Sequence, residues 1–268
     1  MRQQPLSMES NQLAEKQRVA AGTQRTGHPL KGIFYRLRDP ELVTDMVMRA
    51  ATESWHLISP FEFSKLYRQV RGHTMCSVAR LRGLHEGVKW VVERHLDGDL
   101  VECGCARGGS AALMALSLRQ LGERRKLWLF DTFEGLPAPT ADDPDYEIAE
   151  LFTGSCLGQL EEVRELFRDR GVAEGVLFVK GLFQDTIPRS PIERIALLHI
   201  DGDWYESVKV CLEELYDKVV PGGIIQFDDY GYWKGARKAV DEFLAKREIK
   251  APLKRLDYSG RSLQKAGA

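Results

Sequence analysis

Four aspartates at the ends of two strand-like runs offer the most distinctive chemistry in this sequence. Asp201 and Asp203 close the run HIDGD, and Asp228 and Asp229 close the run IIQFDD. Neighbouring strands of a parallel sheet lie about 5 Å apart, so these side chains can meet. Carboxylates that close cannot all stay ionised, and a divalent cation is the simplest way to neutralise them. Oxygen ligands favour a hard ion such as Mg²⁺, with Mn²⁺ or Ca²⁺ as substitutes, and disfavour zinc.

An ion at this position would activate a hydroxyl group. A coordinated hydroxyl has a lowered pKa, and a nearby carboxylate can then remove its proton. The turn at Gly202 is expected to direct the carboxylate of Asp203 into the pocket. The alternative is that each aspartate pair only caps the loop after its strand through backbone amides. His199 lies in the middle of the apolar run ALLHI, so we expect a buried, hydrogen-bonded histidine and not a base.

A glycine-rich turn with a preceding acid forms a second constellation. Glu102, Gly104, Gly108 and Gly109 spell E-x-G-x-x-x-G-G where a strand-like run meets a helix-like run. Glycines there allow tight turning and close approach of the backbone. A dinucleotide site would instead show G-x-G-x-x-G around a pyrophosphate. The acid points to a cationic or hydroxylated ligand, and S-adenosylmethionine offers an ammonium, a sulfonium and a ribose without a phosphate.

Positions after the next strand-like runs extend this predicted cofactor site. Asp131 ends the second run, where a carboxylate can accept hydrogen bonds from both ribose hydroxyls. Ser110 begins the following helix, either as a cofactor contact or as an N-cap. Gly181 and Gln184 follow the third run, where an adenine ring would lie, and an ordinary loop is the alternative.

The elements that must position these residues alternate between strands and helices. The strand-like runs are DLVECG, KLWLFDTF, GVLFVKG, RIALLHIDGD and GGIIQFDDYG, and helix-forming stretches separate them. This alternation predicts a parallel sheet covered on both faces. The segment PLKRLDYSGRSLQKA is expected to add an antiparallel hairpin. The predicted fold class is therefore α/β, with a doubly wound, mostly parallel seven-stranded sheet and an N-terminal helical cap.

Three segments follow from this pattern. Residues 1–28 are polar and predict a flexible tail. Residues 40–70 have apolar residues at helical spacing, and residues 29–85 are predicted to form a helical cap that serves as the dimer and lid region. Residues 86–268 form the main α/β domain. Within it, LPAPTADDPDYEIAELFTGSC interrupts the alternation. Because ligands bind at the carboxyl ends of the strands in such sheets, this excursion is expected to act as a lid.

Composition narrows the class of partner. Lysine plus arginine number 38 against 39 aspartates and glutamates, so the chain lacks the basic surface that nucleic acid requires. No apolar run reaches the roughly 20 residues of a membrane helix, and the first residues lack the apolar core of a signal peptide. We therefore expect a cytoplasmic protein. The five cysteines are odd in number and scattered, which indicates reduced thiols.

The motifs resemble those of the macrocin O-methyltransferase family, which methylates sugar hydroxyls in antibiotics and related natural products. The resemblance runs from about His73 to the C-terminus, and DGD-x-YES followed by DDYG is its specific part. Its carriers are TMCS, VECGCARGGS, LFDTFEGLP, HIDGDWYES, PGGIIQFDDYG and GARKAVDEF. The first 70 residues match only loosely, and such segments shape the acceptor pocket.

This resemblance implies a role for each motif position. Asp201, Asp228 and Asp229 are similar to the three Mg²⁺ ligands of the family, and Asp203 is similar to its general base. The resemblance also implies the class I methyltransferase fold and a homodimer whose N-terminal region helps to cover the site. The positions that resemble the lining of the methyl-donor site are Thr74, Met75, Glu102, Gly104, Ser110 and Asp131.

The predicted function is a metal-dependent O-methyltransferase that uses S-adenosylmethionine and Mg²⁺. The expected acceptor is a sugar hydroxyl of a glycosylated natural product in antibiotic biosynthesis. A phenol or catechol methyltransferase is the alternative, because a metal-bound diol requires almost the same carboxylates. An NAD-dependent oxidoreductase and a non-catalytic scaffold are more distant: the dinucleotide turn is absent, and a scaffold would be expected to have lost one of the acids.

Overall fold

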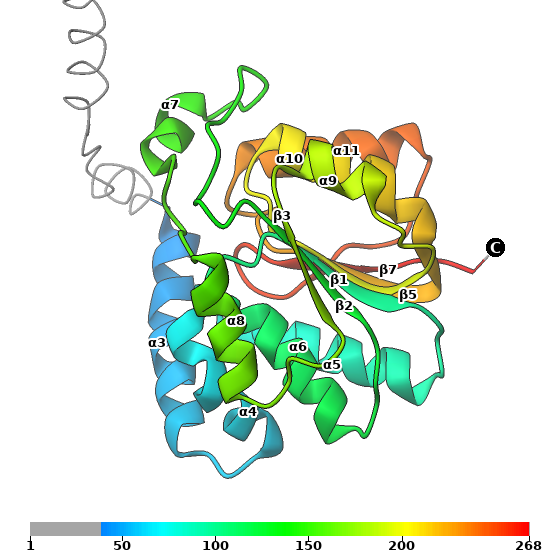
Figure 1. The fold of residues 1–268 in the computed structure, drawn as a ribbon. Coiled ribbons are helices and arrows are strands. Elements are labelled where there is room, and N and C mark those ends of the chain that lie inside the picture. The colour runs from blue at the N-terminus through cyan, green and yellow to red at the C-terminus, as the bar shows by residue number, and fades with distance from the viewer. Residues whose placement is uncertain (1–38, 268) are drawn as a thin grey trace, which may run out of the picture.

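A seven-stranded sheet forms the centre of the computed structural model, which describes residues 39–267 (Figure 1). The strand order is β3-β2-β1-β4-β5-β7-β6. The first five strands in the chain are parallel, and the last two add an antiparallel hairpin. The strands are β1 (Asp99–Cys103), β2 (Leu127–Asp131), β3 (Val176–Lys180), β4 (Ile195–Ile200), β5 (Val219–Phe227), β6 (Lys254–Arg255) and β7 (Arg261–Gln264).

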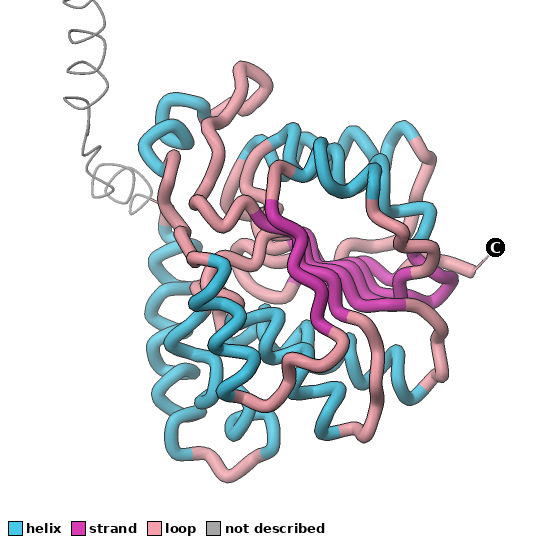
Figure 2. The backbone as a smooth tube through the Cα atoms, in the orientation of Figure 1, coloured by secondary structure: helices cyan, strands magenta, loops and turns pink. Residues whose placement is uncertain are grey.

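Helices cover both faces of this sheet, which confirms the predicted doubly wound α/β fold (Figure 2). One face carries α4 (Glu62–Val70), α5 (Val78–Glu93), α6 (Gly109–Gln120) and α8 (Leu160–Asp169), with α3 (Pro40–Ile58) packed along α4 and α5. The other face carries α9 (Phe183–Thr186), α10 (Tyr205–Leu215) and α11 (Lys234–Lys246). The short helix α7 (Tyr146–Ala149) lies in the excursion after β2. Four 3-10 turns span Arg71–His73, Glu150–Phe152, Ile187–Arg189 and Tyr216–Lys218.

The structure describes only part of the segments predicted for the N-terminal region. The flexible tail predicted for residues 1–28 and the first part of the cap, residues 29–38, lie outside the described residues. Within the cap, two helices form where helical spacing was found. Asp39 caps α3 by accepting a hydrogen bond from the Glu41 amide (2.9 Å), and Pro40 occupies the first turn, where its missing N–H costs nothing.

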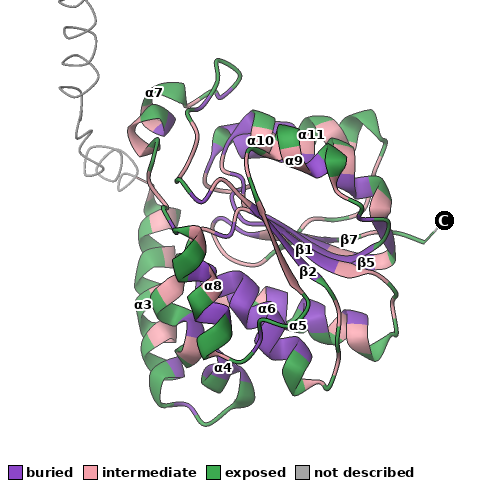
Figure 3. Ribbon diagram, viewed as in Figure 1, coloured by how far each residue is buried: buried purple, intermediate pink, exposed green. Residues whose placement is uncertain are grey.

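The core follows the pleat of the sheet. In β4, Leu197 packs toward α5 and α6, whereas Leu198 packs toward α10 and α11. The helix α6 is the most deeply placed of the described helices, because residues 109–118 are all buried between the sheet and the outer helices (Figure 3). These two apolar layers hold the strands so that the carboxyl ends of the parallel strands share one edge.

Gly104 permits the strand ends to come together at that edge. Its φ is +89°, and a Cβ atom there would lie 1.8 Å from the carbonyl oxygen of Asp201. Only glycine fits both the left-handed backbone and the close approach. The predicted glycine turn therefore brings the end of β1 directly against the end of β4.

The described residues contain neither a disulfide nor a membrane-crossing helix. All five cysteines have free thiols, as predicted. Among residues 39–267, none of the helices combines the length and the apolar character needed to cross a bilayer.

Candidate active site

A cavity of about 620 Å³ opens at the carboxyl ends of the strands. This volume lies within the range of sites that bind small molecules. Its walls come from α3, the turn after β1, the excursion after β2, and the ends of β4 and β5. The sequence-predicted residues that line it are Thr74, Met75, Gly104, Ser110, Asp131, Gln184, Asp201, Asp203, Asp228 and Asp229. The cavity lining does not include Glu102, Gly181 or the turn glycines Gly108 and Gly109.

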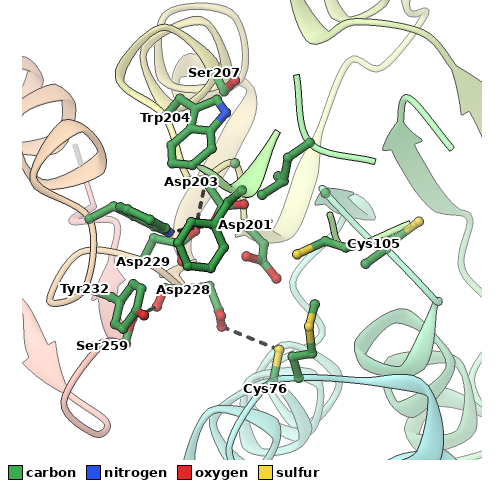
Figure 4. Close-up of a pocket in the computed structure, with 18 of the residues that line it drawn as sticks. Cys76, Cys105, Asp201, Asp203, Trp204, Ser207, Asp228, Asp229, Tyr232 and Ser259 are labelled. Carbon is green, nitrogen blue, oxygen red and sulfur yellow. Dashed lines mark hydrogen bonds between the residues drawn. The ribbon is translucent and has the colours of Figure 1, made fainter. Parts of the chain in front are cut away.

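The four predicted aspartates gather on one wall of this cavity (Figure 4). One carboxylate oxygen from each of Asp201, Asp203 and Asp229 lies within 4.8 Å of the others. A second such group joins Asp201 with Asp228 and the thiol of Cys76. The prediction that side chains from the two strand ends meet is confirmed by this geometry.

Three of these carboxylates, those of Asp201, Asp203 and Asp229, have raised pKa values, because nearby cationic side chains do not offset their burial and mutual repulsion. Burial, and then repulsion from Asp228 and Asp229, raises the pKa of Asp201 well above its ordinary value. Burial and repulsion from Asp229 likewise raise the pKa of Asp203. Burial and Asp228 raise the pKa of Asp229 to about 6. A cluster in which ionisation is this unfavourable is suited to hold a divalent cation.

Asp228 differs, because two cationic side chains contact it. Arg80 Nη1 forms an ion pair with Asp228 Oδ2, and His199 Nε2 donates to Oδ1 at 3.3 Å. Burial alone would raise the pKa of Asp228, but Arg80 and His199 together lower it. An ionised carboxylate offers about four lone-pair positions, so Asp228 still has room for a metal ion.

A buried chain of alternating charges runs beneath the acid cluster. His199 has no exposed surface and donates from Nδ1 to Glu102 Oε1 at 2.7 Å, which confirms its prediction as a hydrogen-bonded core histidine. Burial would lower the pKa of His199, but its bonds to Asp228 and Glu102 raise that pKa to about 9. At the other end, Arg80 Nε donates to Asp257 Oδ2 at 3.1 Å. Glu102 of the glycine turn and Asp228 of the acid cluster are thus joined through His199.

Asp203 is held in a special backbone conformation. Its φ is +57°, in the left-handed region that few non-glycine residues adopt. We expected Gly202 to provide this turn, but the left-handed residue is Asp203 itself. Asp203 Oδ1 accepts a hydrogen bond from Trp233 Nε1 at 2.7 Å, and the Asp203 amide donates to Asp229 Oδ2 at 3.1 Å. Strained backbone that is fixed by such contacts is common in active sites.

Aromatic side chains wall the cavity next to the acids. Trp204 and Trp233 meet edge to face with ring centroids 4.8 Å apart, and Phe152 of the excursion lies 5.3 Å from Trp233. Trp204 Nε1 donates to the carbonyl of Pro137 at 2.7 Å, which ties the excursion to the start of α10. The buried Asp143 makes a second tie by accepting from the Tyr205 amide at 2.7 Å. The predicted lid segment therefore forms part of the cavity wall.

The side of the cavity next to the glycine turn is built around Asp131. Its Oδ2 accepts from the amides of Cys105 and Ala106 at 2.8 and 2.9 Å, and its Oδ1 accepts from the Phe133 amide at 2.7 Å. Asp131 therefore shapes the glycine turn as well as facing the cavity. Glu102 lies fully buried below, and its Oε2 has no hydrogen-bond partner among the described residues.

Thr74 and Met75 line the cavity, whereas Gly181 does not. Gly181 has φ +143° and stands behind the wall, whereas the residues that follow it, including Gln184, face the cavity. Thr74 lies against Gly109, where a Cβ atom would come within 2.7 Å of the Thr74 Cβ. Gly109, the third glycine of the turn, thus lets the Thr74 segment approach the start of α6.

Some residues of the site were not predicted from the sequence. Arg80, Cys76, Asp257 and Trp233 all line the cavity, and Arg80 and Trp233 contact predicted acids directly. Arg80 lies within an amphipathic helical pattern, where an arginine is ordinarily solvent-exposed. The motif TMCS, which lies just before Arg80 in the sequence, was the nearest indication that this segment belongs to the site.

Comparisons with known proteins agree with this geometry. A family model described as macrocin O-methyltransferase (TylF) matches residues 47–265. The demethyldecarbamoylnovobiocin O-methyltransferase of Streptomyces niveus is 39% identical over 193 residues, which cover 70% of this chain and 74% of that protein. The 8-demethyl-8-(2,3-dimethoxy-alpha-L-rhamnosyl)-tetracenomycin-C 4'-O-methyltransferase of Streptomyces olivaceus is 37% identical over 194 residues, with the same coverage.

A solved structure shows the same fold. The O-methyltransferase NovP superposes with a TM-score of 0.69 at 38% sequence identity, and the match covers 73% of this chain and 83% of that one. The predicted resemblance and the predicted enzyme class are thereby confirmed. The chain belongs to the macrocin O-methyltransferase (TylF) family and is an S-adenosylmethionine-dependent O-methyltransferase of the class I fold.

Proposed function

We propose that this enzyme transfers the methyl group of S-adenosylmethionine to a sugar hydroxyl of a glycosylated small molecule, with Mg²⁺ bound at the acid cluster. The observation that carries the proposal is the gathering of Asp201, Asp203, Asp228 and Asp229, because these acids lie in the same cavity as the glycine turn. The relative from Streptomyces olivaceus is named as a 4'-O-methyltransferase of a rhamnosyl-tetracenomycin, and its substrate class supports a sugar acceptor here.

In this proposal the residues divide the work as the family resemblance implies. Asp201, Asp228 and Asp229 would hold the ion, and Mg²⁺ would supply a Lewis acid that lowers the pKa of the acceptor hydroxyl. Asp203 would take the hydroxyl proton on its carboxylate. The acceptor oxygen would then form a bond to the methyl carbon as the carbon–sulfur bond breaks, and the electron pair would remain on sulfur. Trp204 and Trp233 would exclude water from the reacting atoms.

The acceptor class is tested by incubating the enzyme with S-adenosylmethionine, Mg²⁺ and matched compounds. A rhamnosyl glycoside and its aglycone, together with a catechol, would be followed by mass spectrometry for addition of one methyl group. We expect methylation of the glycoside and none of the aglycone or the catechol. Methylation of the catechol alone would replace the proposal with the phenol and catechol alternative.

Replacement of Asp131 is expected to weaken cofactor binding. Asp131→Ala removes the acceptor proposed for the ribose hydroxyls and also three hydrogen bonds to backbone amides of the adjoining turns. Hydrogen bonds to a charged group contribute about 1.5–3 kcal/mol, so S-adenosylhomocysteine affinity should fall roughly 10- to 150-fold. Titration calorimetry measures this, with Asp169→Ala at the exposed end of α8 as the control. Unchanged affinity would place the ribose elsewhere.

We also propose a homodimer that buries the outer face of α3. The exposed fractions of Val47, Met48 and Ile58 are 65%, 61% and 81%, and Phe61 just beyond the helix is 64% exposed. Apolar surface concentrated in this way usually marks a protein interface. Light scattering on Met48→Glu and wild-type protein tests the assignment, because a charge at a dimer interface should yield monomer. A monomeric wild-type protein would contradict it.

A further inference from the structure

A second cavity shares a wall with the active-site cavity. It has a volume of about 400 Å³ and lies between α7, the start of α11 and the hairpin of β6 and β7. Tyr232, Trp233 and Tyr258 line both cavities. A ligand that reaches over these three aromatic side chains could therefore occupy the two cavities together.

Basic side chains from three elements converge on this second cavity. Arg237 comes from α11, Arg255 from β6 and Arg261 from β7. The guanidinium carbons of Arg237 and Arg261 lie 5.1 and 5.3 Å from the ring centroid of Tyr230, so both pack on the same ring. Burial, followed by repulsion from Arg255 and Arg237, lowers the pKa of Arg261. The three cations are thus close enough to disfavour one another. We call this cavity the basic pocket.

Backbone carbonyls hold two of these arginines in place. Arg261 Nη1 donates to the carbonyls of Gly260 and Asp257 at 2.8 and 3.1 Å. Arg237 Nε donates to the carbonyl of Tyr230 at 3.2 Å. Such contacts fix the position of a guanidinium without neutralising its charge, because a carbonyl is only a dipole.

Three carboxylates line the basic pocket and are engaged with other groups, and one of them, Asp145, accepts a hydrogen bond from the Lys234 amide at 3.3 Å. Glu41 pairs with Arg255 at 3.3 Å, and Asp39 accepts from the Tyr258 hydroxyl at 2.8 Å while it caps α3. Between residues 39 and 267, neither Arg237 nor Arg261 forms an ion pair with a carboxylate. The basic pocket therefore presents two fixed arginines that lack a counter-ion in the described part of the chain.

We propose that the basic pocket binds the diphosphate of a nucleotide-activated sugar whose hydroxyl lies at the acid cluster. The proposal rests on the proposed function and adds, as a further acceptor, a sugar that still carries its nucleoside diphosphate. Arginine forks match phosphate oxygens and can bind them through paired hydrogen bonds. A sugar with one hydroxyl at the acid cluster and its anomeric carbon at the shared aromatic wall would direct the diphosphate into the basic pocket.

Calorimetry with inorganic pyrophosphate and with UDP tests the pocket directly. The full chain is titrated in EDTA, so that phosphate cannot bind through a metal at the acid cluster. We expect saturable binding of both probes and a loss of about tenfold or more in affinity for each of Arg237→Gln and Arg261→Gln. Arg247→Gln is the matched control, because Arg247 also lies over aromatic rings, Tyr216 and Phe243, but is away from this pocket.

Three results would overturn the assignment. These are the absence of saturable binding, an equal loss in Arg247→Gln, and sulfate binding as tight as pyrophosphate binding, which would indicate only general attraction of anions. A kinetic comparison separates this inference from the proposed function. Methylation of neutral glycosides but not of UDP-sugars, with KM unchanged in Arg237→Gln, would remove the inference and retain the function. Arginine-dependent pyrophosphate binding without methylation of any sugar would support the pocket and remove the proposed function.

Discussion

Removal of divalent ions is expected to abolish methyl transfer, and added Mg²⁺ is expected to restore it. Asp201, Asp203 and Asp229 share one wall of the cavity, and the protein provides its cationic contacts mainly to Asp228. Without an ion the three acids would repel one another or take up protons, so the acceptor hydroxyl would be neither oriented nor activated. The measurement is formation of S-adenosylhomocysteine after EDTA treatment and exhaustive dialysis. Full turnover in chelator would remove the metal from the mechanism.

The effect of Mg²⁺ on the Tm provides an independent test of ion binding at the acid cluster. The pKa of Asp229 is raised to about 6 by burial and Asp228, and burial raises the pKa of Asp201 and that of Asp203 well above the ordinary value. An acid whose pKa is raised in the folded state binds its proton more tightly there than in the unfolded chain. Its contribution to the stability of the fold is therefore fully present below about pH 4 and is lost as the pH rises through about 6 and beyond. Mg²⁺ should therefore raise the Tm more at pH 8 than at pH 5.5. An equal gain at both pH values would show that the ion binds elsewhere.

The fold was predictable because local pattern and long-range packing agree in most elements. The run RIALLHI is apolar at successive positions, as a strand buried on both faces must be, and Leu197 and Leu198 indeed pack into opposite layers. The terminal hairpin was predicted from the turn signal at Ser259-Gly260, and in the structure β6 and β7 flank this turn. The packing of the cap was less predictable, because α3 exposes apolar side chains and the sequence pattern does not indicate what they contact.

The acid cluster was also predictable, whereas its neutralisation was not. Strand ends in a parallel sheet share an edge, so Asp201 and Asp228 had to be neighbours. Which side chain reaches them from a helix depends on the packing of α5 against the sheet, and the sequence pattern does not encode that angle. Arg80 therefore went unrecognised. Similarly, Glu102 begins the glycine motif in the sequence, but its hydrogen-bond partner in the structure is His199, which lies opposite it in the pairing of β1 with β4.

Asp203→Asn is expected to lower kcat by about 10²- to 10⁴-fold, the usual contribution of a positioned base, while metal and cofactor affinity are kept. Asparagine is nearly isosteric, and its amide oxygen can still accept the hydrogen bond from Trp233 Nε1 that Asp203 Oδ1 accepts at 2.7 Å. The side chain would keep its place but could no longer take a proton. Steady-state kinetics at saturating Mg²⁺ and S-adenosylmethionine measure the loss, and part of the rate should return at high pH, where hydroxide accepts the proton.

Asp201→Asn separates the ligand role from the base role. Asp201 belongs to both groups of potential ligands, whereas Asp203 joins only the one with Asp229, so Asp201 is the more central ligand. Its replacement removes a charged ligand, and the Mg²⁺ concentration for half-maximal activity should rise. Asp203→Asn should leave that concentration near the wild-type value. Equal Mg²⁺ dependence in the two variants would contradict the division of roles. An Asp203→Asn enzyme with nearly wild-type kcat would show that an ion-bound hydroxyl loses its proton without help from the protein.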